Sequence, residues 1–238
     1  MTSTPPPARP HKMRRTTVAD QIKNLILTNG LRSGDALPTE AELCATLDVS
    51  RSSVREAIRN LSTLDIVDVR HGHGTFVSGM SLAPMVEVLV FRGALSPGDS
   101  LQALREVVEI RRALDLSMSE RVVQANHGVE SPELDALVAD MEERAQRGES
   151  FLEADRAFHA MLLDSTGNRL AGQLVAAFWD VHTAVIPQLG LPVPAEILKT
   201  VTAHGDMLAA ARAGDAESYR RAVVEHYEPL QRVLDEHR

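Results

Sequence analysis

Three histidines and one aspartate in the C-terminal half stand where they could share a metal ion. Asp155 and His159 are four residues apart, so that in a helix they project from one face. His204 lies about ten residues before Gly214 and His226 about twelve after it, so two antiparallel helices would bring both imidazoles to a similar height. Imidazole nitrogen and carboxylate oxygen suit zinc, nickel, manganese or iron, and four such ligands on an octahedral ion leave two positions open. Spacing alone fits solvent-facing or locally bonded histidines better.

Three arginines form a second candidate site. Arg51, Arg55 and Arg59 fall four apart on one face of a predicted helix, which the hydroxyl of Ser50 can cap. The other face carries an apolar stripe: Val54, Ala57, Ile58 and Leu61. A helix buried on one side and armed with arginines on the other suits a DNA major groove. Alone, the stretch fits a solvated surface helix better, but its neighbours favour DNA.

The elements around this helix have the order of a winged helix-turn-helix. The apolar spacing predicts a helix over 16–29, and a capping box of Thr39 and Glu42 opens a short one over 40–47, followed by a tight turn. Two strands are then expected over 66–70 and 75–78, with glycines in the turn between them. A hairpin in this place is a wing. His71 and His73 at its tip fit DNA contact, a metal site or a solvated turn.

Charge separates the two ends of the chain. Its 238 residues carry a net charge of −8, but residues 1–79 hold 10 lysines and arginines against 8 acidic residues, so their net charge is +2. A mildly basic N-terminal part joined to an acidic remainder is consistent with DNA binding, since the attraction of phosphates to basic side chains is local. No apolar stretch has membrane-spanning length and no signal region follows the basic N-terminus, so we expect a cytoplasmic protein. Cys44 is the only cysteine, which excludes disulfide frameworks within one chain.

The remainder of the chain has helical spacing and no strand pattern. Helices are expected over 82–91, 101–126, 132–147, 150–165, 169–188, 194–212 and 216–236. The predicted fold is therefore mostly α: an N-terminal winged helix-turn-helix with a small β-hairpin, then an all-α antiparallel helical bundle. The expected division is a disordered arm over 1–15, a DNA-binding domain over 16–79, a linker with a short helix over 80–100 and the bundle over 101–238.

Several motifs of residues 16–79 resemble the winged helix-turn-helix of the GntR family of bacterial transcription regulators. They are Leu37-Pro38-Thr39-Glu40, Val49-Ser50-Arg51, Val54-Arg55-Glu56-Ala57 and Gly74-Thr75-Phe76-Val77. The resemblance implies that the arginines read base edges while the wing tip enters the minor groove. The expected DNA contacts are Arg51, Arg55, Ser50, Ser52, Arg59, Thr39, His71 and Gly72.

This chain departs from the GntR pattern at three positions. Ala41 stands where the family often has an arginine that contacts DNA. Asp48 and Asp65 stand where glycine is usual, at turns expected to need a left-handed backbone. Aspartate tolerates that conformation better than most residues, but it adds negative charge near DNA.

Residues 101–236 resemble the C-terminal ligand-binding domain of the FadR subgroup of this family, called FCD. The motifs are Glu109-x-Arg111-Arg112-x-Leu114, Asp155-x-x-Phe158-His159, Gly167-Asn168, His204 and His226. Many members with an aspartate and three histidines at these places hold a metal that helps to bind a small organic acid. The resemblance thus favours a divalent transition metal, zinc first and then nickel, manganese or iron, on Asp155, His159, His204 and His226.

Three further residues are candidates for binding the effector. A guanidinium pairs well with a carboxylate, so Arg111 is the candidate for an effector's acid group, although it could instead pair with Glu109 or Asp115. Asn168 could donate to a ligand or cap the following helix. His182 could line the pocket or lie on the surface.

These features lead to three functional hypotheses. The first is a homodimeric regulator that binds a palindromic double-stranded DNA operator and senses a small carboxylate at the metal. Repression that the effector relieves is the commoner behaviour in the family, so we expect a repressor. The second is a metalloenzyme with an accessory DNA-binding domain, for which Glu153 and Asp164 are the only nearby candidate bases. The third is a regulator whose metal only locks the helices. We expect a regulator, not an enzyme, and no membrane partner.

Overall fold

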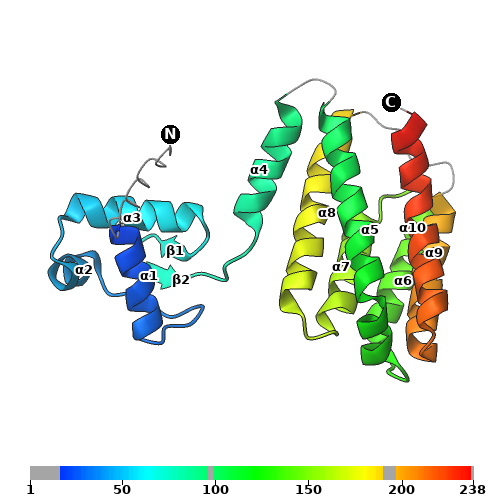
Figure 1. Cartoon of the computed structure of the whole chain (residues 1–238), viewed down its shortest axis with the longest axis horizontal. Helices are drawn as coiled ribbons and strands as arrows, with labels where there is room; N and C mark the ends of the chain where they lie inside the picture. Colours follow the sequence, from blue (N-terminus) through cyan, green and yellow to red (C-terminus); the bar gives the residue numbers. More distant parts are fainter. Residues whose placement is uncertain (1–16, 96–98, 190–196, 237–238) are drawn as a thin grey trace, which may run out of the picture. The chain divides into compact units, whose positions relative to one another are not determined.

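The computed structural model describes residues 17–95, 99–189 and 197–236, which form ten helices and one β-hairpin. The chain divides into two compact units, Met1–Ser81 and Leu82–Arg238 (Figure 1). The predicted fold class is confirmed. The arm expected over 1–15 lies outside the described residues.

The N-terminal unit is three short helices and a hairpin, whose bounds are α1 (Val18–Thr28), α2 (Glu40–Leu47), α3 (Arg51–Thr63), β1 (Val67–Arg70) and β2 (Gly74–Val77). Each helix begins at a side-chain cap, from Thr17, Thr39 and Ser50 in turn. The expected stripe of α3 is buried against residues such as Ile22 and Leu43. Burying one face of α3 leaves the arginine face outward.

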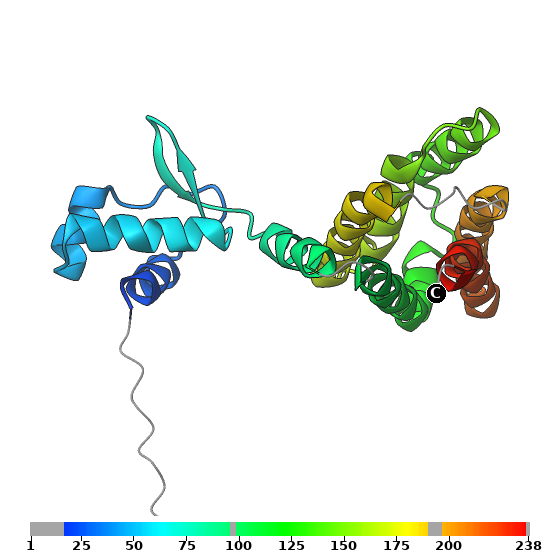
Figure 2. The same ribbon diagram turned by 90° about the horizontal axis from the view of Figure 1, so that it is seen from above.

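The hairpin is antiparallel, with Val67 opposite Val77 and Arg70 opposite Gly74. Figure 2 shows it projecting from the helices of its own unit. Gly72 at the tip has a φ of +75°, a backbone that glycine adopts without strain. Asp48 and Asp65 have φ values of +51° and +52°, so the left-handed turns expected at these departures are present. The carboxylate of Asp65 accepts a hydrogen bond from Ser81 N at 2.7 Å, which fastens the end of α3 to the chain after the hairpin.

The C-terminal unit is all helical, with the bounds α4 (Ala83–Ala94), α5 (Asp99–Asn126), α6 (Pro132–Gln146), α7 (Leu152–Asp164), α8 (Arg169–Leu189), α9 (Ile197–Ala213) and α10 (Ala216–Glu236). Short connections make α7 antiparallel to α8 and α9 antiparallel to α10 (Figure 1). Gly214, with a φ of +77°, turns the chain between the last two helices. The helices of this unit pack around one core, which includes Leu104, Phe158, Val175, Met207 and Val223.

Several boundaries differ from expectation by one to three residues; α4, for example, ends at Ala94, three residues later than predicted. The helix α5 begins at Asp99, two residues earlier than predicted, while residues 96–98 of the turn expected there lie outside the description. The helix α9 is described from Ile197, so the start predicted at residue 194 is not described either. Among the described helices, none has the length and apolar character needed to cross a bilayer.

Candidate functional site

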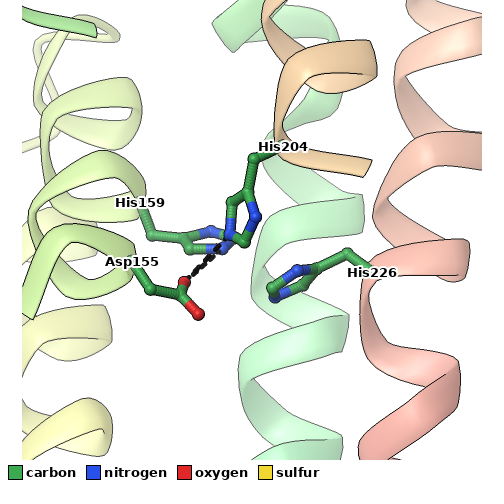
Figure 3. Close-up of side chains that lie close together, drawn as sticks. All are labelled: Asp155, His159, His204 and His226. Atoms are coloured by element: carbon green, nitrogen blue, oxygen red, sulfur yellow. Dashed lines mark hydrogen bonds and ion pairs between the residues drawn. The ribbon is translucent and has the colours of Figure 1, made fainter. Parts of the chain in front are cut away.

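The Asp155, His159, His204 and His226 side chains meet inside the C-terminal bundle. Figure 3 shows two of them coming from α7, one from α9 and one from α10, all pointing into the same space. Each is at most 4 % exposed. One ligand atom from each residue can be chosen so that all four lie within 4.8 Å of one another. We name these four residues the Asp/His cluster.

The donor set of the Asp/His cluster fits a divalent transition metal. Ligand atoms about 2.1 Å from a common ion lie at most about 4.2 Å apart, close to the spacing seen. His204 Nε2 lies 3.0 Å and His159 Nε2 lies 3.3 Å from Asp155 Oδ1. Apart from that His159–Asp155 ion-pair distance, three buried ring nitrogens, His159 Nε2, His204 Nδ1 and His226 Nδ1, form no hydrogen bond within the described part of the chain. Buried polar atoms are ordinarily bonded, so this many unmatched nitrogens in one place indicates room for a ligand-accepting ion.

Asp115 on α5 holds the ring of His159 from behind. Its Oδ2 lies 3.3 Å from His159 Nδ1 and accepts a hydrogen bond of 2.7 Å from the hydroxyl of Tyr227. An ionised carboxylate can only accept, so it favours the proton on Nδ1 and leaves Nε2 for the cluster. Sequence reasoning considered Asp115 only as a partner for arginine. A usable signal was its place one helical turn after Arg111.

Electrostatics also favours a cation in the Asp/His cluster. Burial lowers the pKa of His159, but the carboxylates of Asp115 and Asp155 outweigh it and raise that pKa to about 9. Burial opposes ionisation of Asp155, yet the imidazoles of His204 and His159 hold its pKa well below the usual range. Burial, together with His204 and His159, lowers the pKa of His226 well below its usual value. The carboxylates of Asp115 and Asp155 thus favour a positive charge on the His159 ring, and a divalent cation bound in the cluster could supply positive charge in its place.

A cavity of about 410 Å³ opens beside the Asp/His cluster, and Asp155 and His226 line it. Two of the candidate effector residues, Arg111 and His182, line it as well. Most of its other lining side chains are apolar, and they come from α6 to α10 and from the connection between α6 and α7. The cluster and the cavity are therefore adjacent, with Asp155 and His226 belonging to both.

Arg111 is the most deeply buried charge of the cavity wall, at 1 % exposed. Its guanidinium stacks over Trp179, 3.8 Å from the ring centroid, and its Nη1 lies 3.3 Å from His182 Nδ1. Neither Glu109 nor Asp115 pairs with it, and no described carboxylate forms a salt bridge to it. Burial and the nearby guanidinium lower the pKa of His182 to about 3, so that ring is neutral and can accept from Arg111. A buried guanidinium without an anion is a receptor for a carboxylate.

Asn168 lies apart from the cavity. Its side-chain oxygen accepts a hydrogen bond from Ala171 N at 3.3 Å, at the start of α8. It is absent from the described cavity lining. The geometry therefore favours the capping role over effector binding.

On the N-terminal unit, the arginine face of α3 is open. Arg51, Arg55 and Arg59 are exposed, and Arg51 and Arg59 form no ion pair with any described residue. Arg55 differs, since its Nε lies 2.8 Å from Glu40 Oε2 on α2. That bond spans 15 residues and was not foreseen; the positions of Glu40 and Arg55 on two helices around a tight turn were the only sequence signal.

The other expected DNA contacts have local duties or lie at the wing. Ser50 accepts from Ser53 N at 3.2 Å and its hydroxyl lies 2.8 Å from that of Ser52. Thr39 exchanges hydrogen bonds with Glu42, so its hydroxyl is occupied by capping. His71 and Gly72 are exposed at the hairpin tip. DNA would therefore compete with the capping hydrogen bonds for the hydroxyls of Ser50 and Thr39, whereas His71 and Gly72 are exposed.

Comparison with known proteins agrees with this architecture. Residues 14–77 match the bacterial regulatory proteins of the gntR family, and residues 106–229 match the FCD domain. FCD domains are known to bind metals, and regulators of the GntR family bind DNA and small-molecule effectors. The proteins of this family are regulators, not enzymes.

Individual relatives match along most of the chain. The galactonate operon transcriptional repressor of Escherichia coli (strain K12) is 23 % identical over 191 residues, covering 80 % of this chain and 83 % of that protein. The transcriptional regulator LutR of Bacillus subtilis (strain 168) is 26 % identical over 151 residues, covering 63 % and 67 %. The solved structure of Streptococcus agalactiae GntR superposes with a TM-score of 0.67 at 28 % identity, covering 90 % of this chain and 97 % of that one. The chain belongs to the GntR family of transcription regulators, in the FadR-like subgroup whose C-terminal unit is an FCD domain.

Proposed function

We propose that this regulator is a metabolite-responsive repressor that senses a small carboxylate at a metal held by the Asp/His cluster. The domain of residues 16–79 reads DNA, residues 80–100 link it to the bundle, and residues 101–238 bind metal and effector. The protein acts in the cytoplasm, where its operator is.

One observation carries the proposal. Asp155 and His226 of the cluster line one cavity of about 410 Å³ together with Arg111, whose guanidinium has no carboxylate partner among the described residues. When bound, a divalent transition metal supplies a Lewis acid for an anionic oxygen, and zinc is the proposed ion, ahead of nickel, manganese and iron. Arg111 supplies the second cationic contact, held over Trp179. His182 accepts a hydrogen bond from the guanidinium and keeps its orientation.

DNA recognition is proposed for the exposed face of α3 and the wing. Arg51 and Arg55 read base edges in the major groove, Arg59 contacts phosphate and Gly72 with His71 enters the minor groove. A homodimer places two such domains on a palindrome, one half-site each. The galactonate operon relative is a repressor by its description, which supports repression here. The effector would weaken operator binding through its different affinity for two arrangements of the dimer.

The test uses the full-length protein loaded with zinc. A binding site is selected from random double-stranded DNA, and anisotropy titrations then measure operator affinity with and without candidate carboxylates. We expect a palindromic site, two chains per site and at least a tenfold loss of affinity with an effector.

Two results would contradict the proposal. A protein that binds metal but whose operator affinity and melting temperature no carboxylate changes has a purely structural metal. Turnover of a candidate acid by the zinc-loaded protein would instead support a metalloenzyme.

A further inference from the structure

Among the described lining residues of the cavity beside the Asp/His cluster, the cationic and imidazole side chains gather at one end. Asp155 and His226 of the cluster, together with Arg111, His182 and Tyr227, mark that end, which we name the floor. The upper part is lined by Leu152, Ile186, Ile197, Leu230 and Val233.

Positions along the helices place all five of these side chains on the same side of the floor. Leu152 lies three residues before Asp155, and Ile197 lies seven before His204. Ile186 lies four residues after His182, while Leu230 and Val233 lie four and seven after His226. Since α7 and α9 run opposite to α8 and α10, each of these steps leads toward the same end of the bundle. At 1.5 Å per residue, the apolar part extends about 10 Å from the floor.

The floor accommodates one acid group. Arg111 is the only lysine or arginine among the described lining residues. Glu149 at the rim is itself an acid, bound to Arg147 at 3.1 Å. A second carboxylate carried into the upper part would meet no cation among the lining residues that the structure describes. The lining thus selects against dicarboxylates.

We propose that the effector is a monocarboxylate with an apolar body, such as an aliphatic or aromatic acid, bound with its carboxylate on the floor and its hydrocarbon in the upper part. This inference rests on the proposed function, because it names the class of acid that the same site takes. It separates this chain from a galactonate type of ligand, whose several hydroxyls would lose water without finding partners among leucine, isoleucine and valine.

The volume agrees with such a molecule. An apolar cavity of about 150 Å³ holds a benzene ring, and this one has about 410 Å³. A carboxylate with six to ten carbons fits, whereas acetate would leave the apolar part unfilled. Among the described lining residues outside the floor, Ser150 and Thr200 are the two that carry a hydroxyl.

The experiment is calorimetric titration of the zinc-loaded full-length protein with acetate, butyrate, hexanoate, phenylacetate, gluconate and hexan-1-ol. We expect affinity to rise about fourfold per added methylene from acetate to hexanoate. Gluconate and hexanol should bind at least tenfold more weakly than hexanoate, because one lacks the apolar body and the other the carboxylate.

A variant tests where the hydrocarbon lies. Ile186→Phe reduces the space in the upper part and should weaken hexanoate and phenylacetate at least tenfold, with acetate affinity and zinc content unchanged. Leu170→Phe, at a position of the same helix that is 56 % exposed, is the matched control and should change nothing. Ile186→Ala, which removes volume without adding any, should shift the preferred acid to a longer chain.

The outcomes separate this inference from the function on which it rests. If gluconate binds as tightly as hexanoate and weakens operator binding, the apolar assignment is overturned while the proposed function stands. If no acid of either type binds, both fall. If hexanoate binds equally to Ile186→Phe, its hydrocarbon is not in the upper part and the inference is again overturned.

Discussion

Glu40, the first residue of α2, holds Arg55 of α3 through a 2.8 Å contact between Oε2 and Nε. The bond uses Nε and not the two terminal nitrogens of the guanidinium, which form the fork that can pair with guanine. If α3 binds DNA as proposed, we expect Glu40 to have two opposite effects: it orients Arg55, and it places a negative charge beside the phosphates.

The first prediction concerns this pair. Glu40→Gln removes the charge while keeping an oxygen acceptor, so affinity for random DNA should rise and the ratio of specific to non-specific affinity should fall about fivefold. The pair is half-exposed and contributes at most about 1 kcal/mol to stability, so the variant should fold. Anisotropy titrations on operator and random duplexes measure both affinities. Glu56→Gln on α3 removes the same charge without touching Arg55 and is the control; an equal loss of specificity there would show that charge alone acts.

The second prediction concerns Arg51, which has no intramolecular ion pair among the described residues. Arg51→Ala should reduce operator affinity by about 1–3 kcal/mol if it forms a bidentate contact with a base. Affinity for random DNA should change far less. Arg220→Ala, in the C-terminal unit, removes a cation of the same kind and should leave operator binding intact. Equal losses on operator and random duplexes would identify Arg51 as a phosphate contact.

Local signals explain how much of the fold was predictable. Capping by Thr39 and Ser50 and the apolar stripe of α3 involve residues within one or two turns, and the structure has these features where they were expected. The antiparallel turn at Gly214 likewise set the relative heights of His204 and His226, and the structure brings them together, with ring centroids 4.5 Å apart. Spacing along a helix predicted the helix faces and the similar heights of the two histidines, whereas the shared metal site was predicted only with the resemblance to FCD domains.

Contacts between distant elements were not predictable in this way. Asp115 and His159 are 44 positions apart on α5 and α7, and only the rotation of each helix about its axis decides whether they meet. The same rotation turns Arg111 inward onto Trp179, away from Glu109. The apolar upper part of the cavity also depends on four helix ends at once. None of these facts is contained in a local pattern.

The third prediction concerns the support behind His159. Asp115→Asn should weaken zinc binding about 10–100-fold. The amide oxygen can still accept a hydrogen bond from His159 Nδ1, but it lacks the negative charge that makes the imidazole a stronger ligand. Zinc affinity is measured by competition with a chromophoric chelator. Asp140→Asn, at an aspartate of α6 paired with Arg144 outside the cluster, is the matched control. Unchanged zinc affinity in Asp115→Asn would show that Asp115 serves packing only.

The fourth prediction concerns metal content. His204→Ala should remove most of the bound zinc and with it the stabilisation by the metal, which for free zinc at about 100 times its dissociation constant is about 2.7 kcal/mol. Elemental analysis and melting curves with and without chelator measure the two effects. His127→Ala changes an exposed histidine of the same unit and should keep both. Full zinc content in His204→Ala would exclude this residue as a ligand.

The fifth prediction is the pH dependence of zinc binding. Burial lowers the pKa of His159, but Asp115 and Asp155 raise it to about 9 in the metal-free protein, so the ring is protonated at pH 7. Zinc needs its lone pair and must displace that proton. Apparent zinc affinity should therefore fall about tenfold for each pH unit below 9, and binding at pH 7.5 should release about one proton from this ring. Calorimetry in two buffers of different ionisation enthalpy measures the release.

Asp115→Asn gives this prediction its own control. Without the Asp115 carboxylate, the pKa of His159 loses a cause of its elevation, so fewer protons should be released at pH 7.5 and the pH slope between 7 and 9 should flatten. At pH 7, zinc affinity of this variant is lowered by the loss of the Asp115 carboxylate behind His159 and raised because the ring loses its proton more easily. The two contributions can be separated, because only the second disappears above pH 9. A wild-type protein that releases no proton at pH 7.5 would show that zinc binds without the His159 ring.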